Sequence, residues 1–115
     1  MSELIFICHR WRNDPAQPEL DFAQMTKDVT RELALGGDVI PISTGVHYNM
    51  MLDDNDPHER ARGIDCGIEV LKRCDAMWVY RQHGLSEGML KEITFCESHG
   101  IKIETFDFYP WEVTA

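Results

Sequence analysis

The segment from Ser86 to Glu92 places a serine, a glycine and a glutamate where a helix is expected to begin. Ser86 can cap the helix or donate to a phosphate, and the free N–H groups of a first helical turn favour an anion. Gly88 lets a ligand approach the backbone, with Met89 beside it in the same turn. Glu92 follows in the second turn and adds a carboxylate, which can stabilise or trap a cationic reaction centre. The segment therefore predicts a site for a small anionic ligand.

The short basic segment His9-Arg10-Trp11-Arg12 is the second candidate part of this site. Arg10 or Arg12 could neutralise a phosphate, and Trp11 could either stack on a base or serve at an interface. His9 belongs to the same segment. His83 is either a proton donor of the site or a solvated loop residue.

The elements that position these residues follow from the apolar pattern. Leu4–Cys8 is typical of a strand covered on both faces, and Met25, Val29 and Leu33 mark one stripe of a helix that Gly36-Gly37 ends. The expected order is strand 4–8, helix 20–35, strand 38–42, a helix from 56, strand 76–80, helix 86–99 and strand 101–106. This order predicts a single domain over residues 1–115, with a small doubly wound (Rossmann-like or flavodoxin-like), mostly parallel sheet of about four to five strands and helices on both faces.

Local signals refine these boundaries. Pro41 predicts that its strand lies at an edge or ends early. Residues 43–55 read as a long loop of a kind that often carries function. Asp56, Pro57 and Glu59 predict a helix start with Asp56 as N-cap, Pro57 in the first position and Glu59 completing a capping box.

In such sheets, ligands bind beyond the carboxyl ends of the strands, where the strand order reverses. If the first and third strands are neighbours there, loops 9–14 and 81–86 converge. The basic segment and the helix that Ser86 caps then face one crevice.

Bulk properties exclude several classes of partner. The net charge of −9 opposes binding to duplex nucleic acid or a membrane surface, and no apolar run is long enough to cross a bilayer. The cysteines (Cys8, Cys66, Cys74 and Cys96) and the histidines are scattered without metal-ligand spacing, so we expect no metal and no cofactor. With no signal peptide recognised at the N-terminus, we expect a cytoplasmic protein.

The pattern Ser86-x-Gly88-x-x-x-Glu92 resembles that of the nucleoside 2-deoxyribosyltransferase-like superfamily, especially a small branch found in phages and bacteria. The resemblance extends over nearly the whole chain, through Ile5-Phe6-Ile7, Gly37, Pro41-Ile42, Arg62, the segment from Leu71 to Ala76, and Gly100-Ile101. It implies that Glu92 is the nucleophile at the anomeric carbon of a sugar. A serine at position 86 is similar to that of the nucleoside 5′-monophosphate N-glycosidases, where it meets the phosphate.

Two departures separate this chain from those enzymes. Eight residues before Asp75, the enzymes place an aspartate that acts as the acid, and this chain has Gly67 there. Asp65 and Glu69 do not substitute without a register shift, since two residues along a helix turn a side chain by about 200°. The usual small, Gly-Pro-containing loop after the first strand is also replaced, here by Cys8-His9-Arg10-Trp11-Arg12.

Two functions stay open on this sequence. The first is an enzyme, a nucleotide N-glycosidase or deoxyribosyltransferase-like protein with Glu92 as nucleophile. The second is a non-catalytic protein that holds a nucleotide or an ADP-ribose-type signal. Glu92 supports the first and Gly67 supports the second.

Apolar side chains outside the expected core predict self-association. Met50, Met51 and Leu52 end the long loop, and Phe106, Phe108, Tyr109 and Trp111 form an aromatic tail. Such groups commonly bury against something. Superfamily relatives form homodimers, so we expect a homodimer or a higher symmetric homo-oligomer with the loop or the tail at its interface.

Overall fold

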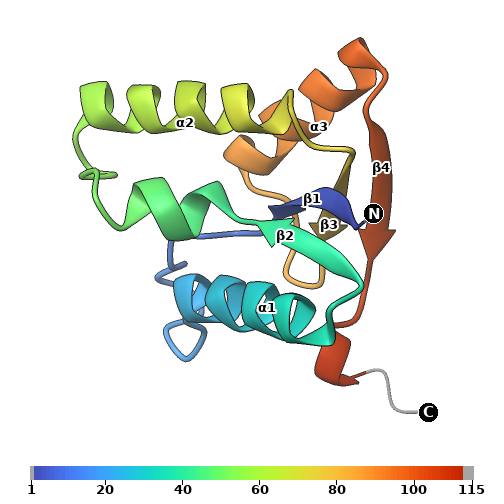
Figure 1. Cartoon of the computed structure of the whole chain (residues 1–115). Coiled ribbons are helices and arrows are strands. Elements are labelled where there is room, and N and C mark those ends of the chain that lie inside the picture. The colour runs from blue at the N-terminus through green and yellow to red at the C-terminus, as the bar shows by residue number, and fades with distance from the viewer. Residues whose placement is uncertain (1, 113–115) are drawn as a thin grey trace.

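A sheet of parallel strands in the order β2-β1-β3-β4 organises the computed structural model, which describes residues 2–112. The strands are β1 (Glu3–Cys8), β2 (Val39–Ile42), β3 (Ala76–Tyr80) and β4 (Lys102–Phe106). β1 is central: Ile5 pairs with Pro41 of β2 on one side and with Ala76 of β3 on the other. The expected doubly wound α/β fold is confirmed, with four strands and every pairing parallel (Figure 1). Pro41 lies on an edge strand, as its residue type predicts.

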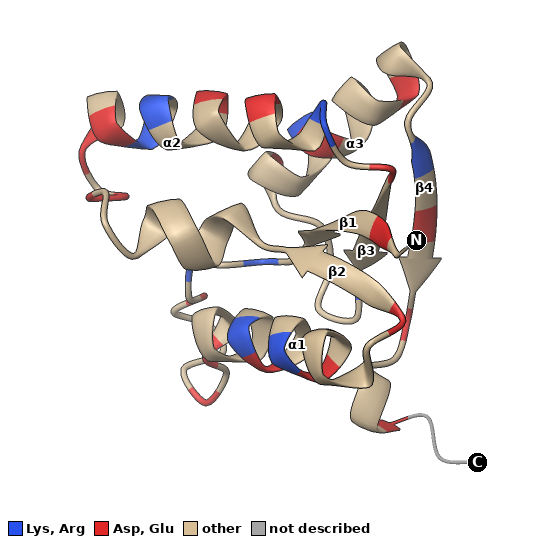
Figure 2. Cartoon of the chain, in the orientation of Figure 1, with Lys and Arg blue, Asp and Glu red and all other residues tan. Residues whose placement is uncertain are grey.

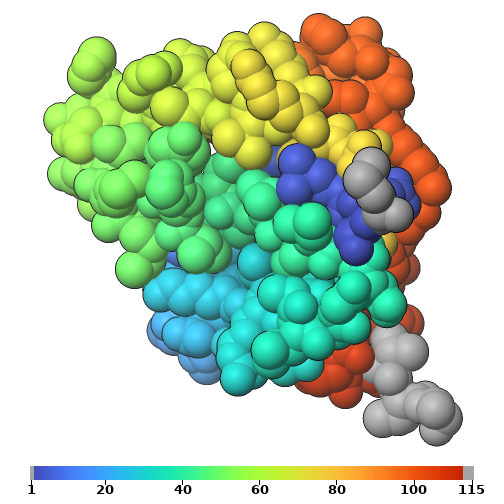
Figure 3. Space-filling view, in the orientation of Figure 1, coloured from blue at the N-terminus to red at the C-terminus, as the bar shows by residue number. Residues whose placement is uncertain are grey.

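Helices cover both faces of this sheet. α1 (Phe22–Gly36) lies on one face, and α2 (Pro57–Leu71) and α3 (Glu87–His99) lie on the other (Figure 1). β1 alternates accordingly: Ile5 and Ile7 pack in the cluster that contains Val29 of α1, whereas Phe6 and Cys8 pack in the cluster of α2 and α3. β1 and β3 are therefore buried on both faces. In the space-filling view, the segment before α2 packs against α2 itself (Figure 3).

The helix ends follow their predicted signals with one exception. Gly37 ends α1 in the left-handed conformation, at φ 78°. Asp56 caps α2 by accepting from the N–H groups of His58 (2.9 Å) and Glu59 (3.2 Å). The predicted capping box is wrong in its second half, because Glu59 Oε1 accepts from the N–H of Asp53 at 3.2 Å instead of returning to Asp56. The Glu59 carboxylate thereby stabilises the turn that precedes α2.

The predicted long loop at 43–55 is also corrected, because its first half is helical. Gly45–Asn49 forms η1, a short π-helix, and Ser43 Oγ accepts from the N–H of Val46 at 3.3 Å at its start. η1 contacts both α1 and α2. These tertiary contacts order a segment whose local sequence carries no strong helix signal.

The aromatic tail is split between core and surface. Tyr109 is buried and stacks with Tyr80 (ring centroids 6.2 Å apart), just before η2 (Pro110–Glu112). Phe108 and Trp111 remain 64% and 45% exposed. Within residues 2–112, no helix combines the length and apolar character that crossing a bilayer requires.

Met77→Ala tests the core between the sheet and the α2–α3 layer. Met77 is fully buried in β3, so the truncation should leave a cavity and lower the free energy of unfolding by about 2–5 kcal/mol. Urea denaturation measures this loss. The matched control is Leu35→Ala, at a side chain of α1 that is 67% exposed, where the change should stay within about 0.5 kcal/mol. Equal effects of the two truncations would contradict the assigned core.

Candidate functional site

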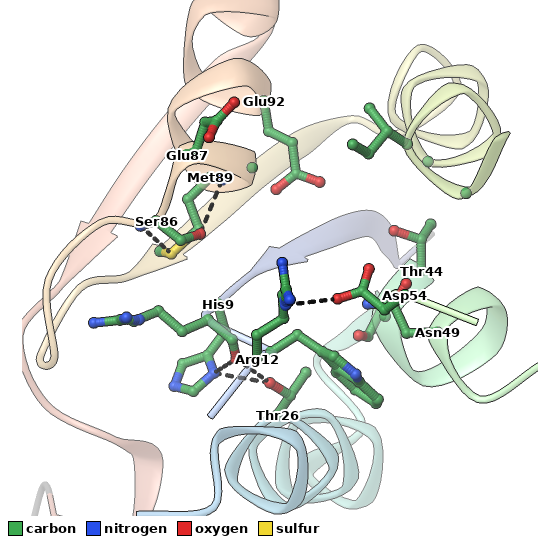
Figure 4. Close-up of a pocket in the computed structure, with 18 of the residues that line it drawn as sticks. His9, Arg12, Thr26, Thr44, Asn49, Asp54, Ser86, Glu87, Met89 and Glu92 are labelled. Carbon is green, nitrogen blue, oxygen red and sulfur yellow. Dashed lines mark hydrogen bonds and ion pairs between the residues drawn. The ribbon is translucent and has the colours of Figure 1, made fainter. Parts of the chain in front are cut away.

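A pocket of about 480 Å³ opens beyond the carboxyl ends of β1 and β3. Its walls come from the β1–α1 loop, η1, α2 and the start of α3 (Figure 4). Eight of the residues predicted from sequence line it: His9, Arg10, Trp11, Arg12, Ser86, Gly88, Met89 and Glu92. The ninth, His83, does not. The structure thus gathers most of the predicted residues around one cavity.

The start of α3 forms one end of the pocket. Ser86 Oγ accepts from the N–H of Met89 at 3.3 Å, which makes Ser86 the N-cap. At Gly88, the nearest atom to an added Cβ is Ser86 Oγ, 4.0 Å away, so the pocket side of this turn is open. Glu87 pairs with Lys91 along the helix at 3.5 Å. Because first-turn N–H groups have no preceding helical acceptor, this end suits an anion.

Glu92 points from α3 into the pocket (Figure 4). Burial raises the pKa of its carboxyl from 4.5 to about 7, and the neighbouring Cys8 thiol only partly offsets this rise. Burial, followed by the Glu92 charge, raises the pKa of the Cys8 thiol well above its usual value, so Cys8 stays protonated. A carboxyl that changes charge near neutral pH can act as an acid, a base or a nucleophile.

His9 is a structural hydrogen-bonding residue at the edge of the pocket. Its Nδ1 donates to the carbonyl of Arg10 (2.7 Å), because a carbonyl only accepts, and Thr26 Oγ1 lies 2.8 Å from the same nitrogen. Nε2 then accepts from the Tyr109 hydroxyl at 2.7 Å. Burial, together with the nearby His83 and Arg10, lowers the pKa of His9 to about 4, so the ring is neutral at physiological pH.

Arg10 joins the two loops that were expected to converge. Its Nη1 donates to the carbonyl of His83 at 2.8 Å, and its guanidinium lies 4.8 Å from the centroid of the Phe22 ring. The His83 ring packs against Phe22 and Tyr109, with centroids 5.6 and 6.2 Å away. The His83 ring therefore packs against these two aromatic rings and does not line the pocket.

Trp11 fixes the basic loop against η1. A Cβ at position 45 would lie 2.7 Å from Cε3 of Trp11, so only glycine lets the indole pack this closely. Trp11 also lines the pocket, so one ring serves both the packing and the pocket wall.

Sequence reasoning missed the side of the pocket formed by η1 and α2, where Thr44, Asn49, Asp54 and Arg60 lie. Arg12 Nε is 3.0 Å from Asp54 Oδ2, and Arg60 Nε is 4.0 Å from Asp54 Oδ1. The long loop at 43–55 was singled out as a place for function, but no local motif marks these particular residues. Only the fold brings them together.

Gly67 lines the pocket from α2, facing Thr44. A Cβ at position 67 would lie 3.2 Å from Thr44 Oγ1, so a hydroxyl occupies the space beside this position. Asp65 and Glu69 are exposed and do not line the pocket, as the helical geometry predicts. Among residues 2–112, no three His, Cys, Asp or Glu side chains gather closely enough to hold a metal ion.

Glu92→Gln should reveal the cost of burying this carboxylate. The folded-state pKa is about 7 and the ordinary value is 4.5, so between these values the unfolded chain loses a proton that the folded protein keeps. The stability contributed by Glu92 therefore falls as pH rises through this window. At pH ~8 the variant should be more stable by about 1–3 kcal/mol, whereas near pH ~4.5 the two proteins should nearly coincide.

Urea denaturation across this pH range measures the difference. Glu97→Gln, which changes the same charge at an exposed position of α3, is the control. The interpretation fails if Glu92→Gln keeps the pH dependence of the native protein.

No curated protein matches the sequence. Residues 3–106 match a family described as a domain of unknown function (DUF7768), and this range contains every strand and all three α-helices of the described residues. The chain belongs to the DUF7768 family.

Proposed function

We propose that the pocket binds a nucleoside monophosphate and acts at its N-glycosidic bond, as a nucleotide N-glycosidase or deoxyribosyltransferase-like protein. The observation that carries this proposal is Glu92, a carboxyl inside the pocket whose pKa burial raises to about 7. The resemblance of the Ser86-x-Gly88-x-x-x-Glu92 pattern to that superfamily supports the same role.

The 5′-phosphate would sit at the start of α3. The N–H groups of Glu87 and Gly88 and the Ser86 hydroxyl supply donors there, and the helix dipole favours a negative charge. Arg10 is held beside the β3–α3 loop by its bond to the carbonyl of His83. It can therefore offset phosphate charge at this end of the pocket.

The ionised Glu92 would attack the anomeric carbon as the bond to the base breaks. The base leaves with the bonding electrons and takes a proton from solvent, because the chain has glycine at position 67, where the resembling enzymes carry the acid. Water, or a second base in a transfer reaction, then cleaves the sugar–carboxylate ester. This chemistry requires the carboxylate form, so turnover should rise with pH through about 7.

A second candidate function is non-catalytic binding of a nucleotide or ADP-ribose-type ligand. The observation that favours it is the wall at Gly67, where the Thr44 hydroxyl lies in place of an acid. Without an acid at position 67 to protonate the leaving base, the site can hold the ligand and leave its glycosidic bond intact.

A panel of nucleoside 5′-monophosphates distinguishes these functions. Chromatography should detect release of free base by the native protein, and Glu92→Gln should abolish it while calorimetric affinity stays within about tenfold, or ~1.4 kcal/mol. Glu97→Gln on the exposed face of α3 should retain turnover. Binding without base release selects the second function, and unchanged turnover in Glu92→Gln rules out the nucleophile.

We also propose that the chain assembles as a symmetric homodimer or higher homo-oligomer. Met50 and Met51 are 60% and 63% exposed at the end of η1, and Phe108 and Trp111 are exposed in the tail. Burying such groups between copies would offset the repulsion between chains of net charge −9.

Light scattering at micromolar concentration should therefore report a mass of at least twice 13.3 kDa, unchanged at high salt. An obligate interface of this kind buries on the order of 2,000 Å² in total. Met51→Asp or Phe108→Asp should dissociate the assembly, and the variant that does so identifies the loop or the tail as the interface. A 13.3 kDa particle for the native chain would refute the proposal.

A further inference from the structure

Two arginines from different elements share one carboxylate at the side of the pocket away from Ser86. Arg12 lies in the loop after β1, and Arg60 lies in α2. Arg12 Nε is 3.0 Å from Asp54 Oδ2, and Arg60 Nε is 4.0 Å from Asp54 Oδ1. Figure 2 shows basic residues, in blue, on the loop after β1 and on the N-terminal half of α2. One carboxylate therefore faces two guanidinium groups, so these three side chains together carry a formal charge of +1 in a chain of net charge −9.

This cluster is separate from the anion site expected at α3. In Figure 4, Ser86 and Asp54 lie on opposite sides of Arg12. Arg12, Asp54 and Arg60 all line the pocket, and their side chains are 53%, 25% and 37% exposed. Both arginines are thus accessible to a ligand that enters the pocket from solvent.

Asp54 presents the charge and geometry that a ligand oxyanion would offer. A planar guanidinium binds carboxylate and phosphate with the same fork of N–H donors. Because this ion pair is partly exposed, it contributes little stability, so a phosphate can displace the carboxylate at small cost. Asp54 then serves to hold the arginines in place while the pocket is empty.

We propose that Arg12 and Arg60 form a second anion subsite, so that the preferred ligand is a nucleotide with phosphates at two separate ends. This inference rests on the proposed function for the first phosphate, which it places at α3. The separation of the two subsites favours a nucleoside 3′,5′-bisphosphate over a 5′-diphosphate, whose phosphates lie together.

Calorimetry with a 5′-monophosphate, a 5′-diphosphate and a 3′,5′-bisphosphate of one nucleoside tests the subsite. The native protein should bind the bisphosphate about tenfold or more tighter than either other ligand. Arg12→Gln and Arg60→Gln should each remove most of this advantage, measured as the ratio of bisphosphate to monophosphate affinity. Arg62→Gln, on the same helix and outside the pocket lining, should retain it.

Asp54→Asn is expected to change bisphosphate affinity in the opposite direction to the two arginine variants. Removing the competing carboxylate should tighten bisphosphate binding several-fold and raise the ratio of bisphosphate to monophosphate affinity. Weaker bisphosphate binding in this variant, or equal affinity of the native protein for all three ligands, overturns the second subsite alone. If the native protein binds none of the three, the proposed function fails with it.

Discussion

The parallel pairing of β1 with β3 is the constraint on which the pocket depends. Both strands are inner strands of the sheet and buried on both faces, and because they are parallel their carboxyl ends lie at the same edge. The loops that leave them are then joined by the bond from Arg10 to the carbonyl of His83. The basic loop and the cap of α3 therefore take their positions from this pairing.

The same architecture explains why Glu92 is unusual. A glutamate one turn into a helix ordinarily faces solvent, but α3 packs against the sheet beside Cys8 and holds this carboxyl among protein atoms. Ionising it costs free energy that an apolar residue would not cost. Proteins carry groups with strongly shifted pKa values at functional sites more often than elsewhere. The site around Glu92 is therefore the part of the molecule where stability and function oppose each other.

Sequence reasoning reached the fold and one half of the pocket, for physical reasons that differ between the two halves. Buried strands, the Asp56 cap and the Gly37 stop are local signals, and the parallel order of elements then brings Arg10 near Ser86. Asp54 and Arg60 belong to no such motif, because their meeting with Arg12 depends on how η1 and α2 pack. η1 itself is stabilised by tertiary contacts, which a pattern of propensities does not contain.

Under the proposed function, ligand binding and the reaction place opposite demands on the charge of Glu92. An anionic ligand favours the protonated form of Glu92, whereas attack on the sugar requires the ionised form. His9 cannot relieve this conflict, since its ring stays neutral above a pKa of about 4. The permanent charges of the arginines can, because they lower the potential energy of the phosphate and of the carboxylate together. An acidic protein can thus handle an anionic substrate when its few arginines are concentrated where the substrate binds.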